Sequence, residues 1–515
     1  MNLEKKSVAE LREMAKKMGV TGLSSLRKSQ LICRIEERTS EDKQTEPVAP
    51  AEPNKQVEQP EPNEPNGSTE KKTGNSGKAA GNNRRDARKS GKTGKFEKRE
   101  KNAGFENKNR NTKPSYSGEK VAIAKERYVT EIPVEEAARQ DSGIVKTGIL
   151  DIQQGFGFVR CDNYLSGAND VYVAGPLIRY HHLRTGDMVT GHLKKADKNE
   201  KFSAMLYIEE VNGRPVKEIE HRKKFEELTP IFPNQRIRLE TERASVSTRM
   251  IDLIAPIGKG QRGMIVSQPK TGKTTLLKQV AQAVKLNEPN IHIIILLIDE
   301  RPEEVTDIKE TVEGKNVEVI YSTFDEEPNH HIRVSEMVLE RAKRLVESGD
   351  DVLVLLDSIT RLARAYNLTG TQSGKTLSGG LDPAALHMPK KFFGAARNMR
   401  EGGSLTILAT ALVDTGSRMD DVVFEEFKGT GNMELVLDRN LSEKRVFPAI
   451  DIQKSSTRRE DLLLNSEEME AVYIMRRAMG VSIGAESNME QLIELFQRTK
   501  NNKDFMGTLK NLNLF

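Results

Sequence analysis

Apolar and polar segments alternate along the C-terminal half of the chain in a pattern typical of α/β proteins. The runs Met264–Val266, Ile293–Ile298 and Val352–Leu356 are continuously apolar, as expected of strands buried on both faces of a parallel sheet. Segments with helical periodicity separate these runs. The alternation predicts a parallel α/β domain over residues 251–515.

Residues 143–218 show a different pattern, in which short alternating runs are separated by turn residues. Such runs are typical of half-buried strands. The predicted strands are Ile144–Ile152, Gly157–Arg160, Asp170–Val173, Met188–Leu193 and Ala204–Ile208. They predict a small β-barrel, followed by a connector over residues 219–250.

Two further segments precede the barrel. Within residues 1–39, Val8, Leu11 and Ala15 recur at helical spacing and predict a small helical module. This module is either a nucleic-acid contact or a docking cap. Residues 40–142 are predicted to be a disordered insert, because they hold too few apolar side chains to offset the entropy of ordering them.

Charge divides this insert into two parts. Residues 41–66 carry seven acidic residues against two lysines, whereas residues 70–120 carry sixteen Lys or Arg against six acidic residues. The net charge of +5 over 515 residues conceals this opposition. The basic stretch predicts an arm for a polyanion such as nucleic acid, and the alternative is a solvated linker without a partner.

Several classes of protein are disfavoured. The longest apolar run, Ile293–Ile298, is much shorter than the roughly 18–20 residues of a membrane helix, so no membrane partner is expected. The N-terminus lacks the apolar stretch of a secretory signal. The two cysteines, Cys33 and Cys161, cannot form a disulfide framework, and we therefore expect a cytoplasmic protein.

The strongest chemical motif directly follows the first apolar run of the α/β domain. It precedes a predicted helix, which is the setting of a phosphate-binding loop. Backbone N–H groups and the helix N-terminus favour bound phosphate. Lys273 is expected to reach the β- and γ-phosphates and the Thr274 hydroxyl to bind Mg²⁺, while Ser267 replaces the usual leading glycine. The loop residues are Ser267, Gln268, Pro269, Lys270, Thr271, Gly272, Lys273 and Thr274.

The other two apolar runs end in acidic residues. Asp299 and Glu300 follow one run, and Asp357 follows the other. The carboxyl ends of parallel strands meet at one edge of a sheet. Asp357 suits the outer coordination sphere of Mg²⁺, and Glu300 is then free to orient or deprotonate a water molecule. A helix N-cap would explain either acid alone, but together with the loop they predict ATP hydrolysis.

The barrel contains the sequence Gly-Phe-Gly-Phe-Val-Arg at residues 155–160. Strand alternation places Phe156 and Phe158 on one face, where exposed rings would stack on unpaired bases. Arg160 would add a phosphate or stacking contact, and Tyr172 and Phe202 would widen the surface. The alternative is that both phenylalanines belong to the barrel core.

Two polar, glycine-rich loops of the α/β domain each carry one cation. Residues 369–380 contain Lys375, and residues 414–419 contain Arg418. Long loops of this kind inside a compact domain are usually functional or mobile. We interpret the two cations as phosphate contacts, with ordinary solvated side chains as the alternative.

Four longer runs resemble one protein family. They are Asp-Glu-Arg-Pro-Glu-Glu-Val-Thr (299–306), Leu-Asp-Ser-Ile-Thr-Arg-Leu-Ala-Arg-Ala-Tyr-Asn (356–367), Glu-Glu-Phe-Lys-Gly-Thr-Gly-Asn-Met-Glu (425–434) and Lys-Arg-Val-Phe-Pro-Ala-Ile-Asp (444–451). The resemblance is to the bacterial transcription termination factor Rho family, and it extends over residues 1–39 and about 143–515.

The resemblance implies a multidomain α+β protein. Its parts would be the helical module, an OB-fold (cold-shock-like) β-barrel and a RecA-type P-loop ATPase domain. The disordered insert between the module and the barrel has no counterpart in shorter members of the family. Six copies would form a ring that binds ATP and Mg²⁺ between subunits. The implied activity is that of an RNA-stimulated ATPase that moves 5′→3′ along C-rich single-stranded RNA and dissociates RNA polymerase.

The resemblance also implies roles for individual residues. Arg458 corresponds to an arginine finger that reaches the γ-phosphate of a neighbouring subunit. Arg445 would lie at the subunit boundary, Phe447 would stack on adenine, and Thr275 and Arg301 complete the ATP-binding set. The primary RNA site would comprise Phe156, Phe158, Arg160, Tyr172, Glu200 and Phe202, and a secondary site in the pore would comprise Lys375 and Arg418. At Phe202 the family more often has tyrosine.

Two other functions remain open from the residues. One is an RNA-binding protein whose nucleotide site merely switches its affinity, and the intact Glu300, Asp357 and Arg458 count against it. The other is a rotary or proton-coupled ATP synthase subunit, which shares the α/β core. The aromatic surface at residues 155–160 counts against that one.

Deleting residues 70–120 should flatten the dependence of RNA affinity on salt, because each cation that neutralises a phosphate releases a counterion. The slope of log Kd for poly(C) against log salt concentration measures this. An unchanged slope would show that the arm does not contact RNA.

Overall fold

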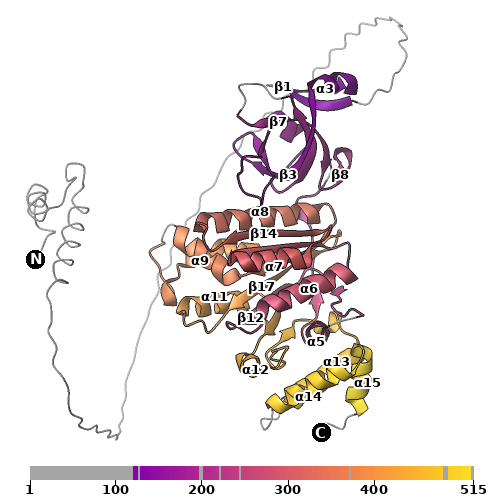
Figure 1. The fold of residues 1–515 in the computed structure, drawn as a ribbon, viewed down its shortest axis with the longest axis vertical. Coiled ribbons are helices and arrows are strands. Elements are labelled where there is room, and N and C mark those ends of the chain that lie inside the picture. Colours follow the sequence, from indigo (N-terminus) through magenta and orange to yellow (C-terminus); the bar gives the residue numbers. More distant parts are fainter. Residues whose placement is uncertain are drawn as a thin grey trace, which may run out of the picture. The chain divides into compact units, whose positions relative to one another are not determined.

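The structure is a computed structural model, which describes residues 120–125, 128–195, 201–219, 222–242, 245–370, 373–479 and 485–511 (Figure 1). The predicted helical module over 1–39, the insert up to residue 119 and the predicted RNA contact Glu200 lie outside the described residues. Within the described part, no helix has both the length and the apolar character needed to cross a membrane.

Residues 141–195 and 201–215 form a closed five-stranded barrel with one short additional strand, β8 (Arg214–Pro215). The barrel strands are β3 (Asp141–Ile152), β4 (Gly157–Arg160), β5 (Val171–Val173), β6 (Met188–Lys194) and β7 (Ser203–Val211). Antiparallel pairing runs from β5 through β4, β3 and β6 to β7, and the parallel pair β5–β7 closes the barrel. Helix α4 (Gly175–Tyr180) joins β5 to β6. This is the expected OB-fold.

The folded segment before the barrel corrects our expectation for the insert, which we predicted to be disordered as far as residue 142. It comprises β1 (Lys120–Lys125), β2 (Tyr128–Pro133) and α3 (Val134–Gln140), and β1 pairs antiparallel with β2. Ile123, Ile132 and Ala137 are buried together with Leu206 of β7. These few apolar residues were hidden in the polar average of the insert.

The C-terminal part contains a predominantly parallel sheet. Its strands, in spatial order, are β14 (Val317–Thr323), β13 (His292–Glu300), β15 (Asp351–Asp357), β17 (Ser404–Leu412), β12 (Arg262–Ser267), β18 (Met433–Val436) and β19 (Ser456–Thr457). All of these neighbours pair in parallel except β19, which is antiparallel to β18. The expected α/β class is therefore present.

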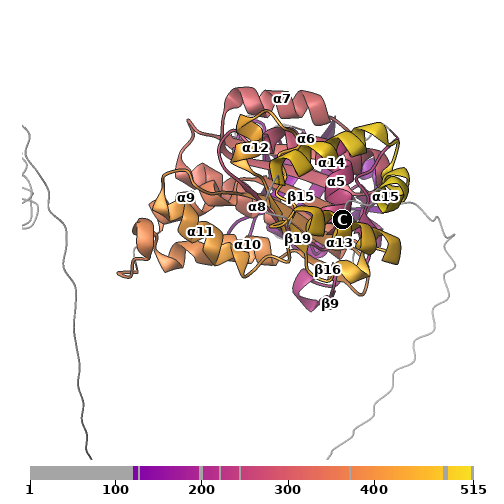
Figure 2. The ribbon, with the colours of Figure 1, turned by 90° about the horizontal axis from the view of Figure 1, so that it is seen from below.

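Helices cover both faces of this sheet (Figures 1 and 2). Alternate residues of β13 belong to two different cores: Ile293 and Ile295 to one, Ile294 and Leu296 to the other. The first core includes α5 (Val246–Ile254), α6 (Lys273–Asn287), α7 (Pro302–Val312), α13 (Ser466–Met479), α14 (Ala485–Arg498) and α15 (Asn502–Asn511). The second includes α8 (Pro328–Glu347), α9 (Ile359–Thr369), α10 (His387–Gly394) and α11 (Arg418–Lys428).

The α/β domain begins earlier than the predicted residue 251. Strand β9 (Pro230–Ile231) pairs with β16 (Arg397–Met399), which pairs with β17, and β10 (Arg236–Ile237) pairs with β11 (Ile257–Gly258). Phe225 and Leu228 are buried in the core that contains α8. Most of the predicted connector is thus packed into this domain.

Candidate nucleotide site and nucleic-acid interface

Strand β12 leads through the predicted phosphate loop into helix α6. Gly272 is the N-cap of α6 and has φ 89°, a left-handed conformation that favours glycine. Lys273 and Thr274 are therefore the first two residues of a 15-residue helix, where the helix dipole favours anions. Ser267 ends β12 in an extended conformation, so this position does not require glycine.

Three predicted side chains from separate elements meet beside this loop. The Nζ atom of Lys273 lies 2.5 Å from Oδ1 of Asp357 and 3.7 Å from Oε2 of Glu300. Thr410 on β17, the strand between β15 and β12, donates its hydroxyl to the same Asp357 oxygen at 2.8 Å. The Thr274 hydroxyl donates to Oε2 of Glu304 at 3.1 Å. The carboxyl ends of β12, β13 and β15 thus form one polar site.

The site holds two buried carboxyl groups. Glu300 is only 4% exposed, and its burial raises its pKa; the Lys273 ammonium opposes this, and the nearby Asp357 carboxylate adds to it. One oxygen of each acid, Oε2 of Glu300 and Oδ2 of Asp357, is buried without a hydrogen bond from the described residues. Such oxygens suit a water molecule and a cation.

A bulge at the end of β13 separates its two neighbouring acids. The pairing of β13 with β14 shifts between Ile298 and Glu300, and Asp299 has φ 55°. Asp299 pairs with Arg361 of α9 at 3.2 Å, whereas Glu300 faces Lys273. The bulge therefore leaves Glu300, and not Asp299, at the phosphate loop.

A cavity of about 330 Å³ adjoins the loop. The residues that line it are Ser247, Lys270, Thr271, Gly272, Thr275, Leu276, Gln279, Leu437, Phe447, Pro448 and Ala449. A Cβ atom on Gly272 would lie 3.7 Å from the Phe447 ring, so this half-exposed ring faces the loop. Arg301 is the N-cap of α7. Arg445 and Arg458 are exposed and are not among the residues that line this cavity.

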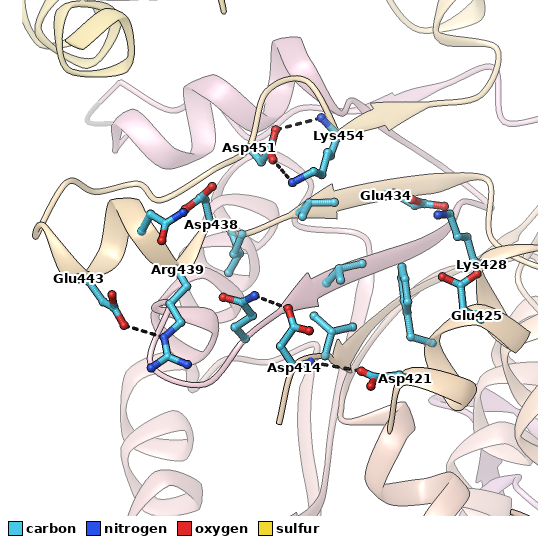
Figure 3. Close-up of a pocket in the computed structure, with 17 residues that line it drawn as sticks. Asp414, Asp421, Glu425, Lys428, Glu434, Asp438, Arg439, Glu443, Asp451 and Lys454 are labelled. Carbon is cyan, nitrogen blue, oxygen red and sulfur yellow. Dashed lines mark hydrogen bonds and ion pairs between the residues drawn. The ribbon is translucent and has the colours of Figure 1, made fainter. Parts of the chain in front are cut away.

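A second cavity of about 960 Å³ reaches the same loop at Gln268 (Figure 3). Seven carboxylates and three cations line it, among them Glu443 of α12 (Arg439–Glu443). Lys428 lies near Glu425 and Glu434 (Figure 3). Because seven carboxylates outnumber three cations, the lining is predominantly negative. This charge repels a triphosphate. The smaller cavity, lined by Lys270 and the start of α6, is therefore the candidate nucleotide site.

Four aromatic rings form a cluster on the barrel, consisting of Phe156, Phe158, Tyr172 and Phe202. Phe158 lies 5.7 Å from Phe156, 6.0 Å from Tyr172 and 5.2 Å from Phe202, measured between ring centroids. All four side chains are partly exposed, and none belongs to the barrel core. The core interpretation of the two phenylalanines is therefore wrong, and the rings are accessible for stacking.

Arg160 is held beneath this cluster by two acids that we did not predict. Its Nε and Nη2 donate to Oδ2 of Asp151 at 3.1 and 2.7 Å, and its Nη1 donates to Asp170 at 2.5 Å. The guanidinium lies 5.0 Å from the Phe158 ring centroid and is 7% exposed. Of its two expected roles, the geometry favours stacking over a phosphate contact. The sequence clue was an acid between apolar neighbours, because Asp151 lies between Leu150 and Ile152.

The two predicted cationic loops lie side by side. Gly379 has φ 78°, and a Cβ atom there would lie 2.5 Å from the backbone nitrogen of Met419, so no larger residue fits. Lys375 and Arg418 are both exposed. The Gln268 side chain of the phosphate loop donates to Asp414 at the start of the second loop (Figure 3). The phosphate loop is thus in direct contact with one cationic loop.

The fold and these sites define a P-loop ATPase that carries an OB-fold nucleic-acid-binding domain. Residues 2–44 match the Rho termination factor, N-terminal domain; residues 146–217 match the Rho termination factor, RNA-binding domain. Residues 247–457 match the ATP synthase alpha/beta family, nucleotide-binding domain.

Relatives that are named transcription termination factor Rho match most of the chain. The protein of Borreliella burgdorferi is 54% identical over 72% of this chain and 72% of its own length. Those of Bacillus subtilis and Pseudomonas aeruginosa are 52% and 49% identical, over 72% and 76% of this chain and 86% and 94% of their own lengths. The chain belongs to the transcription termination factor Rho family. It is an RNA-binding, ATP-driven transcription terminator and an ATPase.

Glu300→Gln should reduce ATP turnover by about 10²-fold or more, because glutamine cannot accept a proton from water. ATP affinity should change little, since Lys273 and the loop remain. Turnover and binding of a fluorescent ATP analogue measure the two effects. Glu303→Gln, an exposed carboxylate on α7, is the matched control. Retained hydrolysis in Glu300→Gln would remove Glu300 as the catalytic acid.

Proposed function

We propose that the chain forms a homohexameric ring in the cytoplasm that hydrolyses ATP with Mg²⁺ between its subunits. It moves 5′→3′ along C-rich single-stranded RNA and dissociates RNA polymerase from the transcript. The observation that carries this proposal is the presence, in one chain, of a phosphate loop beside buried Glu300 and of an exposed aromatic cluster on an OB-fold barrel.

The residues at the phosphate loop fit a magnesium ion. Mg²⁺ is usually held by one or two protein oxygens together with phosphates and water. Thr274 at the start of α6 would bind it directly, and the unpartnered Oδ2 of Asp357 would hold it through water. The ion would neutralise charge on the phosphates. Glu300 orients or deprotonates the attacking water, and Lys273 moves from the two acids to the phosphates.

The position of Arg458 supports a site that two subunits share. Arg458 directly follows the edge strand β19 and is exposed. It does not line the nucleotide cavity of its own chain. We infer that it acts as an arginine finger on the neighbour's γ-phosphate, a contribution of about 10³–10⁵ in rate. Arg445, also exposed, would lie at the same boundary, and Phe447 would stack on adenine.

Buried polar atoms below the aromatic cluster favour cytosine over uracil. Oδ1 of Asp170 is buried and has no hydrogen bond from the described residues, and the Arg160 guanidinium lies beside this carboxylate. A cytosine stacked on Phe158 would present an amino donor to Asp170 and a ring acceptor to Arg160. Uracil would turn a carbonyl oxygen toward the carboxylate, which is repulsive. Lys375 and Arg418, on adjacent loops, would hold the phosphates of RNA in the pore.

The decisive test is the ATPase rate of the purified full chain with and without poly(C), together with its mass in solution. We expect strong stimulation by poly(C), weaker stimulation by poly(U), and a mass of six chains of 57.7 kDa. An ATPase indifferent to poly(C) would contradict the RNA motor. A monomeric mass under ATP and RNA would contradict the shared nucleotide site.

Phe158→Ala should weaken poly(C) binding by about 1–3 kcal/mol, the usual worth of one base–aromatic stack. Fluorescence anisotropy with labelled oligo(C) measures this affinity. Tyr128→Ala is the matched control, because Tyr128 is an exposed ring on β2 outside the aromatic cluster. Equal affinities of the two variants would exclude the cluster as the primary RNA site.

A further inference from the structure

Asp151 connects the aromatic cluster of the barrel to the α/β domain. It lies directly opposite Phe158 in the pairing of β3 with β4 and is 3% exposed. Its Oδ2 accepts from Arg160, and its Oδ1 accepts from Nη2 of Arg333 on α8. Burial opposes ionisation, but the hydrogen bonds from Arg333 and Arg160 outweigh it and lower the pKa of Asp151. One buried carboxylate thus accepts hydrogen bonds from two guanidinium groups that belong to different domains.

A second contact joins the barrel to strand β14 of the α/β domain. In the turn after β4, Asn163 hydrogen-bonds the backbone of Tyr321 on β14 in both directions. Its Nδ2 donates to the carbonyl oxygen at 2.7 Å, and its Oδ1 accepts from the backbone N–H at 3.1 Å. β14 is the edge strand of the sheet, and the Asn163 amide occupies its free backbone groups.

Hydrogen bonds and strand pairing connect both contacts to Glu300. His331, two residues before Arg333, shares a 2.7 Å hydrogen bond between its Nδ1 and Oγ of Ser322. The next residue, Thr323, pairs with Glu300 in the β13–β14 register, and the N–H of Phe324 donates to the Glu300 carbonyl oxygen at 3.2 Å. A displacement of α8 at Arg333 would therefore act on the strand end that positions Glu300.

We propose that Asp151 is a positioning residue that couples RNA binding at the aromatic cluster to the nucleotide site. A base that accepts a hydrogen bond from Arg160 alters the hydrogen bonds that Arg160 donates to Asp151. Asp151 would then shift relative to Arg333, and this shift would displace α8. Such coupling is reciprocal, so bound nucleotide changes RNA affinity by the same factor. This inference rests on the proposed function of the cluster as an RNA site.

The Arg333 contact is separable from the docking of the two domains. Further ion pairs and hydrogen bonds join the barrel to the α/β domain near the C-terminal end of α8. Arg341 donates to Asn212 at 2.6 Å, Arg184 to Glu347 at 3.0 Å, and Arg214 to Asp350 at 2.6 Å. The Arg333 side chain is 43% exposed. Its replacement should therefore leave the domains folded and docked.

The experiment measures the affinity of the full chain for fluorescein-labelled tetracytidylate, with and without Mg²⁺ and a non-hydrolysable ATP analogue. The ratio of the two affinities is the coupling factor, and four nucleotides limit binding to the barrel. In Arg333→Gln, the affinity without nucleotide should stay within about twofold, and the coupling factor should fall about two- to thirtyfold toward one. Arg333→Lys, which keeps the charge, should restore part of it. Arg498→Gln, which removes an exposed ion pair of α14, is the control.

Each outcome distinguishes the inference from the function on which it rests. A coupling factor of one in the unmodified chain, or the same factor in Arg333→Gln, overturns the coupling role. Equal weakening of RNA binding with and without nucleotide also overturns it, because Arg333 would then only support the barrel. An unchanged tetracytidylate affinity in Phe158→Ala would instead refute the RNA site itself.

Discussion

The Lys273 ammonium lies beside two carboxyl groups that the parallel sheet buries, and its single charge offsets part of theirs. Without this cation, Glu300 and Asp357 would repel each other in a poorly solvated site, and burial of either charge would be costly. In the proposed reaction, the phosphates would compete for the same ammonium, and a magnesium ion would supply the charge that Lys273 withdraws. Nucleotide binding would then exchange one cation for another around two carboxyl groups that the ends of β13 and β15 hold in place.

The barrel uses the same principle for recognition. Arg160 is buried only because Asp151 and Asp170 neutralise it, and this arrangement holds a guanidinium against Phe158 while the rings stay partly exposed. In the proposed RNA site, stacking would give affinity for any base, and the unpartnered oxygen of Asp170 would add a preference among pyrimidines. Membership of the Rho family accounts for the combination of this barrel with an ATPase domain in one chain.

Helix α8 has a particular place in this arrangement. Its C-terminal half carries the contacts that dock the barrel, and its first turns lie between Asp151 and the end of β14. A rigid helix with contacts at both ends transmits displacement better than a loop would. The phosphate loop is tied separately to a cationic loop through Gln268 and Asp414. The two candidate RNA sites thus reach the nucleotide site by different routes.

Local sequence pattern predicts much of the secondary structure of this protein and part of its nucleotide site. The barrel strands, the three apolar strands of the sheet and the phosphate loop were all predicted, because strand alternation and loop chemistry depend on neighbouring residues. Glu300 and Asp357 were predicted as well, since the carboxyl ends of parallel strands must share an edge. Contacts between distant residues were not predictable in this way.

The pairing of Asp151 with Arg333 joins residues far apart in the chain, and no local pattern marks it. Thr410 reaches Asp357 only through the order of the strands, and the bulge at Asp299 arises from pairing with β14. The elements β1, β2 and α3 fold because a few of their apolar residues pack against Leu206 of β7. Periodicity and composition describe each segment separately, whereas burial and ion pairing depend on which segments meet in space.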